Sequence, residues 1–119
     1  KAVLLVEDEA LIASELEQML IGFGFETIKI CMTYSDAADQ VKAGGFDLAI
    51  FDINVGGMLS FGLISNAISQ GSAVVTISGY ITSSDALDGR VFLPKPIDPK
   101  RLAGAILQAY GGRELPNAA

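Results

Sequence analysis

Histidine is absent from this 119-residue sequence, and cysteine is represented by Cys31 alone. Without histidine the chain cannot form a Ser–His or Cys–His catalytic pair, and most zinc sites are excluded. A single cysteine cannot form an internal disulfide, which fits a reducing compartment and leads us to expect a cytoplasmic location. Cys31 lies in an apolar run, so we expect it in the core. Any chemistry must therefore come from Asp, Glu, Lys, Ser, Thr and the backbone.

Basic side chains are also few: eight Lys and Arg residues stand against 14 Asp and Glu residues, for a net charge of −6. An acidic surface argues against direct binding to nucleic acid or to an anionic membrane. No apolar run approaches the roughly 20 residues of a membrane-spanning helix, and no signal peptide is visible. Hydrophobic residues make up 50% of the sequence, so we expect a folded core rather than disorder.

Short apolar runs alternate with segments of helical periodicity along the whole chain. The runs are too short for helices and predict buried strands at Ala2–Val6, Thr27–Met32, Leu48–Phe51, Ala73–Ile77 and Val91–Leu93. Segments with one apolar face predict helices at Ala10–Ile21, from Ser35 or Asp36 to Lys42, between Gly57 and Gly71, and from an Asp98 cap to Tyr110, with Leu102, Ile106 and Leu107 facing inward. The segment 82–88 has room for only a turn or two, which predicts a shortened fourth helix.

This alternation predicts an α/β fold in which parallel strands are joined by right-handed crossovers and helices cover both faces of the sheet. For five strands the natural arrangement is the flavodoxin-like (βα)5 doubly wound sheet with strand order 2-1-3-4-5. We expect one domain over residues 1–112, followed by a loose C-terminal tail at 113–119. No internal repeat or linker is visible.

Polar residues follow four of the predicted strands at their carboxyl ends, where doubly wound sheets bind ligands. Each residue by itself could be a helix cap, a charge favoured by a helix dipole, or a surface residue. Their occurrence at four strand ends together favours a common site. The set consists of Glu7, Asp8, Asp52, Ser78 and Lys95.

The residue types in this set predict phosphoryl chemistry. Carboxylates brought close together repel one another unless a cation lies among them, and oxygen ligands alone favour Mg²⁺, to which Asn54 could add its backbone carbonyl. Lys95 offers an ammonium and Ser78 a hydroxyl to phosphoryl oxygens, while Gly79 leaves space for the group to enter. The pattern indicates a phosphoryl group carried on a carboxylate and stabilised by a metal ion and an ammonium group.

Four motifs resemble those of the receiver domain of bacterial two-component response regulators, the CheY-like family. They are V-E-D-E at 6–9, F-D-I-N at 51–54, T-I-S-G at 76–79 and F-L-P-K-P at 92–96. The resemblance covers nearly the whole chain to about Tyr110. It implies a two-component phosphorelay in which a phosphohistidine of a sensor histidine kinase or phosphotransfer protein gives its phosphoryl group to an aspartate. The run Ser78–Tyr80 and the short segment after it resemble α-proteobacterial receivers that are free-standing or fused to sensor kinases.

The resemblance assigns a role to each candidate residue. Asp52 would be the phosphoacceptor. Glu7 and Asp8 would be the acidic pair that binds Mg²⁺ together with Asp52, with Asp8 the more direct ligand, and Asn54 would contribute its carbonyl. Such a domain promotes its own phosphorylation and dephosphorylation and is not otherwise expected to be an enzyme.

Further roles implied by the resemblance concern the phosphoryl oxygens and the response to them. Ser78 and Lys95 would hold those oxygens, and Ser78 and Phe92 would act as switch residues. The bond between Lys95 and Pro96 would be cis, which is otherwise uncommon.

Two departures from the family pattern bear on output. Gly56–Gly57 replaces the Met/Leu-Pro turn common after the phosphoacceptor, and the interval from Ser78 to Lys95 is short. The second departure shortens the fourth helix, whose surface many receivers use to dimerise. A homodimer is therefore one expected form, and its usual surface is altered. We expect no DNA-binding module after Tyr110 and output through a protein contact or a domain outside this chain.

Three other functions are alternatives for a chain of this pattern. A receiver-like interaction module without the chemistry is favoured mildly by the short helix and altered loop. A small phosphatase with an aspartyl nucleophile would need a second Asp where Asn54 stands, because an amide cannot serve as general acid. An FMN-binding flavodoxin would need a phosphate-binding loop after the first strand, where the acidic run 7–9 repels phosphate instead.

Overall fold

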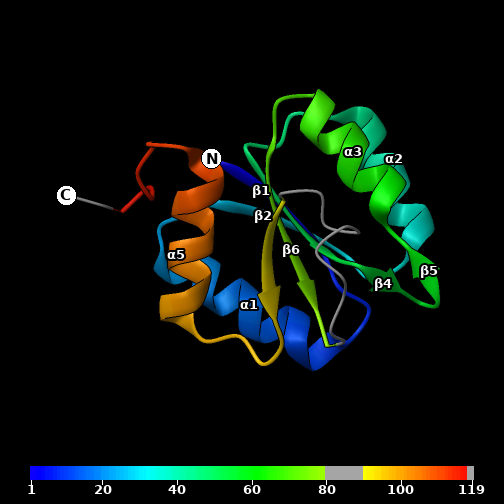
Figure 1. Ribbon diagram of the computed structural model, residues 1–119, viewed down its shortest axis with the longest axis horizontal. Coiled ribbons are helices and arrows are strands. Elements are labelled where there is room, and N and C mark those ends of the chain that lie inside the picture. Colours follow the sequence, from blue (N-terminus) through cyan, green and yellow to red (C-terminus); the bar gives the residue numbers. More distant parts are fainter. Residues whose placement is uncertain (80–89, 118–119) are drawn as a thin grey trace.

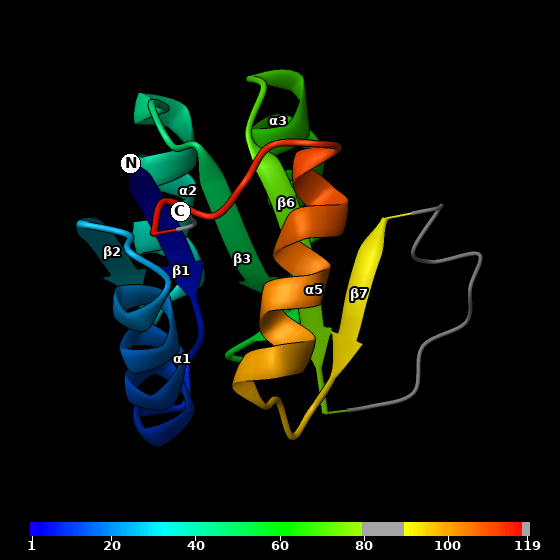
Figure 2. The ribbon, with the colours of Figure 1, turned by 90° about the vertical axis from the view of Figure 1, so that its left-hand side faces the viewer.

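The computed structural model describes residues 1–79 and 90–117, which form a parallel sheet between two layers of helices (Figures 1 and 2). The strands of the sheet are β1 Ala2–Val6, β2 Thr27–Cys31, β3 Leu48–Asp52, β6 Ala73–Ser78 and β7 Val91–Pro94. Their order is β2-β1-β3-β6-β7, and all neighbours are parallel. This is the predicted order 2-1-3-4-5, so the flavodoxin-like fold is confirmed.

Helices cover both faces of the sheet, as predicted. They are α1 Ala10–Gly22, α2 Tyr34–Ala43, α3 Phe61–Ser69 and α5 Pro99–Tyr110. In Figure 2, α1 and α5 lie on one face and α2 and α3 on the other. Because parallel strands are then buried on both faces, β3 and β6 are entirely buried. The expected short helix at 82–88 lies outside the described residues, and no helix within them is long and apolar enough to cross a membrane.

Each face of the sheet has its own hydrophobic core. One core contains Leu16 and Leu20 of α1 together with Leu102 and Ile106 of α5. The other lies beneath α2 and α3 and includes Cys31, which is 1% exposed and confirms the prediction that it is a core residue. The prediction that Leu107 faces inward was wrong, since that side chain is 42% exposed. Leu107 follows Ile106 by one residue, which turns its side chain by about 100° around a helix of 3.6 residues per turn.

The start of α2 differs from the prediction of a cap at Ser35 or Asp36. The N-cap is Thr33, whose Oγ1 accepts a hydrogen bond from the Asp36 N–H at 3.1 Å. Ser35 and Asp36 are residue types that often cap helices, but both lie inside the first turn of α2. The extended backbone of Thr33, with φ −127° and ψ 153°, decides among them.

We therefore expect Thr33→Ala to lower the free energy of unfolding by about 1 kcal/mol, because it removes the only side-chain acceptor for that N–H of the first turn among the described contacts. Ser35→Ala lies inside the helix and should change it by no more than a few tenths of a kcal/mol. Urea denaturation of both variants compares the two positions. A larger loss of unfolding free energy in Ser35→Ala than in Thr33→Ala would instead support Ser35 as the cap.

A small hairpin follows β3 where only a loop was predicted. Its strands are β4 Asn54–Val55 and β5 Met58–Leu59, paired antiparallel. Gly56 and Gly57 form the turn with φ angles of 59° and 88°. A two-residue turn with two positive φ angles suits glycine and joins antiparallel strands closely. Strands of two residues are too short to show an alternating pattern in the sequence.

The segment after α5 also differs from the expected loose tail. Leu115 packs against the core beneath α1 and α5. The Asn117 N–H donates to the Phe23 carbonyl at 3.0 Å, and its side-chain amide donates to the Gly22 carbonyl. These donors satisfy carbonyls at the C-terminal end of α1, which have no partner within the helix. A Cβ at Gly24 would lie 2.8 Å from the Asn117 nitrogen, so glycine permits this contact.

Candidate functional site

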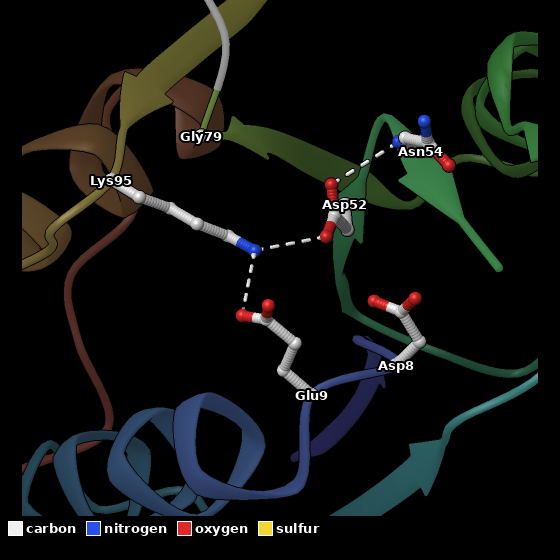
Figure 3. A pocket seen from close by; sticks show the side chains of 6 residues that line it. All are labelled: Asp8, Glu9, Asp52, Asn54, Gly79 and Lys95. Carbon is white, nitrogen blue, oxygen red and sulfur yellow. Dashed lines mark hydrogen bonds and ion pairs between the residues drawn. The ribbon is translucent and has the colours of Figure 1, made fainter. Parts of the chain in front are cut away.

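An open cavity of about 340 Å³ lies at the carboxyl end of the sheet. Figure 3 shows the six residues that line it: Asp8, Glu9, Asp52, Asn54, Gly79 and Lys95. Asp52 ends β3, Asn54 lies in β4, and the other four residues lie in the loops that follow β1, β6 and β7. The sheet order explains this convergence, because β1 and β3 are neighbours and β6 and β7 continue from β3.

Lys95 connects the acidic residues of the site. Its Nζ lies 2.8 Å from Glu7 Oε2 and 2.9 Å from Asp52 Oδ2. Glu9 Oε2 is more distant, at 3.9 Å. Glu7 is fully buried at 0% exposure and Asp52 is buried at 5%. Two buried carboxylates need a nearby cation, and the ammonium of Lys95 supplies it.

Burial raises the pKa of Glu7 from 4.5 to about 7, and the charge of Asp52 adds to the rise against the opposing effect of Lys95. Burial by itself would lower the pKa of Lys95, but its hydrogen bonds and its attraction to Glu7 and Asp52 outweigh this, and the pKa is raised. Lys95 therefore keeps its charge at neutral pH, whereas Glu7 binds a proton more readily than an ordinary glutamate.

Backbone amides from β4 and the hairpin turn hold the other oxygens of the site. Asp52 Oδ1 accepts from the Asn54 N–H at 3.1 Å, and Asp8 Oδ2 accepts from the Gly56 N–H at 3.0 Å. The Asn54 side-chain oxygen accepts from the Gly57 N–H at 2.9 Å. The Gly–Gly turn thus takes part in the site, because its amides fix one of the acidic side chains and Asn54.

The acidic residues fit a site for a hard divalent cation. Glu7, Asp8 and Asp52 each offer a carboxylate oxygen, and these three oxygens lie within 4.8 Å of one another. A set of oxygen atoms alone is the ligand type that Mg²⁺ prefers. Lys95 contacts one oxygen of Glu7 and one of Asp52, and the other oxygen of each carboxylate accepts a backbone N–H at 3.1 Å, from Glu9 and from Asn54 respectively.

Three predicted residues do not line the cavity: Glu7, which is fully buried, Ser78 and Phe92. Ser78, at the end of β6, is 2% exposed, and its carbonyl accepts from the Lys95 N–H at 2.8 Å. Phe92 is half-buried on β7, where it pairs with Thr76, and it does not line the cavity. The bond between Lys95 and Pro96 is cis, as the family resemblance implied. The switch roles of Ser78 and Phe92 stay predictions.

Sequence reasoning missed three contributors to the site. Glu9 lines the cavity, and its position directly after Glu7 and Asp8 could have suggested this. The Gly56 amide carries no side-chain signal at all. Ser60 donates from Oγ to the Asp52 carbonyl at 2.7 Å, although by sequence it is only a possible cap of α3.

Comparison with known proteins points in one direction. The family model described as "Response regulator receiver domain" matches residues 3–107. Transcriptional regulatory protein YvrH of Bacillus subtilis is 26% identical over 88% of this chain, which spans about half the length of that relative (47%).

Solved structures agree with this match. The chain is similar to SdrG from Sphingomonas melonis Fr1, with 30% identity, a TM-score of 0.80 and coverage of 92% of this chain and 96% of the other. It is also similar to the receiver domain of the hybrid histidine kinase CckA, with 31% identity, a TM-score of 0.74 and coverage of 92% and 98%.

Proposed function

Because the chain belongs to the response regulator receiver domain family, we propose that it takes part in a two-component phosphorelay with Asp52 as the phosphoacceptor. One observation carries the assignment. The Asp52 carboxylate lies at a cavity, held by the Lys95 ammonium at 2.9 Å and the Asn54 N–H at 3.1 Å, beside Glu7 and Asp8. A carboxylate placed in this way is oriented for attack on an incoming phosphorus atom.

The phosphoryl donor is proposed to be a phosphohistidine of a partner protein, since this chain contains no histidine. An Asp52 oxygen attacks the phosphorus, the P–O bond forms, the P–N bond breaks, and its electron pair goes to the imidazole nitrogen. The Lys95 ammonium stabilises the negative charge first on the Asp52 carboxylate and then on a phosphoryl oxygen. The Ser78 hydroxyl donates a hydrogen bond to a second phosphoryl oxygen. The partner is a sensor histidine kinase or a phosphotransfer protein.

Glu7, Asp8, Asp52 and the carbonyl of Asn54 would hold Mg²⁺, which neutralises phosphoryl charge when bound. The domain transfers the group to its own side chain and promotes its loss to water, so it has no separate substrate to turn over. We further propose that Ser78 and Phe92 change position on phosphorylation and alter a protein-contact surface. Such a switch requires that the phosphorylated form favour one of two packings.

The test is intact-mass measurement after incubation with acetyl phosphate and Mg²⁺. The wild-type chain is expected to gain the mass of one phosphoryl group, and Asp52→Asn to gain none, because an amide is not a nucleophile for this step. Asp39→Asn, at an exposed position on α2, is the matched control and should behave as wild type. An equal gain of mass in Asp52→Asn would show that Asp52 is not the phosphoacceptor. No gain in the wild type would favour the interaction module without phosphoryl chemistry.

A further inference from the structure

Ser60 contacts the backbone of the proposed phosphoacceptor from a fully buried position. It directly precedes α3 and is 0% exposed. Its Oγ donates to the Asp52 carbonyl at 2.7 Å, and its own N–H donates to the Ile53 carbonyl at 2.8 Å. One residue thus binds two consecutive carbonyls at the point where β3 ends and the hairpin begins.

The sheet does not supply the partner that Ser60 provides. The register of β1 with β3 ends at the pair Val6–Phe51, so β1 pairs with no residue of β3 beyond Phe51. On the other side of the same peptide unit, the Ile53 N–H donates to the Ile77 carbonyl of β6 at 3.0 Å. Both polar groups of the Asp52–Ile53 peptide are therefore bound, and the peptide cannot turn without breaking a buried hydrogen bond.

The hydroxyl of Ser60 is not used in the ordinary way for a serine before a helix. Such a serine usually accepts a hydrogen bond from an amide of the first turn. Ser60 makes no side-chain cap bond, and its φ of −96° and ψ of 10° are not the extended values typical of a cap. Its hydroxyl points to Asp52 instead, while its carbonyl accepts from the Ile64 N–H at 3.0 Å and begins α3.

We propose that Ser60 is a positioning residue for phosphoryl transfer, which rests on the function proposed for Asp52. By fixing the Asp52–Ile53 peptide, it holds the Asp52 carboxylate toward the Lys95 ammonium and the Asn54 N–H. A carboxylate on a short side chain moves with its backbone, and small displacements of a reacting group slow a reaction strongly. Ser60 also ties this geometry to the first turn of α3.

Ser60→Ala is the direct test, with Ser72→Ala as its matched control. Ser72 also donates from Oγ to a backbone carbonyl, that of Phe46 at 2.8 Å, but it lies in the turn before β6, at the opposite end of the sheet from the site. We expect phosphorylation by acetyl phosphate to slow about tenfold in the Ser60 variant and to stay at the wild-type rate in the Ser72 variant. Ser60→Thr, which keeps the hydroxyl, should recover most of the rate.

A second measurement separates this inference from the proposed function. The Asn54 amide signal in the NMR spectrum, followed during titration with Mg²⁺ alone, reports the site without phosphorylation. We expect several-fold weaker Mg²⁺ binding in Ser60→Ala and unchanged binding in Ser72→Ala. Should the alanine variant not fold, Ser60→Cys keeps the size of the side chain with a weaker donor and is expected to show the same changes to a smaller degree.

If the wild type takes up no phosphoryl group, the function of Asp52 fails, and the Mg²⁺ titration still decides whether Ser60 positions the site. If Ser60→Ala matches Ser72→Ala in both rate and Mg²⁺ affinity, Ser60 has only a structural role and the inference is overturned. A loss of rate that Ser60→Thr does not recover, with the threonine variant folded, would also contradict the role of the hydroxyl.

Discussion

Lys95→Met is expected to slow phosphoryl transfer to Asp52 about a hundredfold or more and, at pH 8, to lower the free energy of unfolding by about 3 kcal/mol. The first effect follows because Lys95 is the ammonium 2.9 Å from the acceptor carboxylate, and removal of one such group from a reaction centre typically has this cost. The second follows because Glu7 and Asp52 are buried and would lose their shared cation.

The stability loss should depend on pH in a defined direction. Without Lys95, Glu7 keeps its burial and its repulsion from Asp52 but loses the attraction that lowers its pKa. It is then protonated to a higher pH in the folded state than in the wild type, so the deficit of the variant grows as pH rises above about 7, the folded pKa of Glu7 in the wild type. Urea denaturation at several pH values measures this, with chelator present so that no divalent cation replaces the lysine.

Lys100→Met is the matched control, because Lys100 is exposed on α5 and has no ion pair among the described contacts. It should leave both stability and transfer close to wild type. A Lys95 variant that is as stable as the Lys100 variant at pH 8 would show that the buried carboxylates do not need the ammonium. Phosphoryl transfer at the wild-type rate in Lys95→Met would show that Lys95 takes no part in the reaction.

Glu7→Gln is expected to act in the opposite direction on stability. In the wild type the pKa of Glu7 is 4.5 in the unfolded reference and about 7 in the folded protein, chiefly because of burial. The folded state thus binds more protons between these values, and stability is lost as pH rises from about 4.5 to about 7. Integrated over that interval the loss is about 3 kcal/mol. Glutamine carries no charge, so this loss should be absent.

The measurement is the free energy of unfolding of both proteins from pH 4 to pH 8 in metal-free buffer. The two curves should be close at pH 4 and diverge as pH rises, with the variant more stable at pH 8. Parallel curves would mean that Glu7 has an ordinary pKa in the fold.

The double variant Glu7→Gln with Lys95→Met should regain part of the stability that the single Lys95 change loses. It should regain none of the phosphoryl transfer, which separates the role of Lys95 in stability from its role in the reaction.

These effects concern residues whose positions the sequence indicates well. A buried parallel strand shows as an unbroken apolar run, and the polar residue that follows it marks the carboxyl edge of the sheet. Glu7, Asp8, Asp52, Ser78 and Lys95 were located in this way, and the strand order then brings them to one edge. The inward face of the last helix was predicted correctly at Leu102 and Ile106, which are fully buried. It was wrong at Leu107, because a one-residue difference in phase turns a side chain away from the core.

Local periodicity and residue type at strand ends therefore determined the fold class and the acidic centre of this protein. Only the tertiary structure decided how that centre is held: the bridge from Lys95 to two buried carboxylates, the Gly56 amide on Asp8, and the Ser60 hydroxyl on the Asp52 carbonyl. Apolar patterns report burial, which is a property of single residues. Hydrogen bonds and pKa values instead depend on distances between residues far apart in sequence, and those distances exist only once the chain has packed.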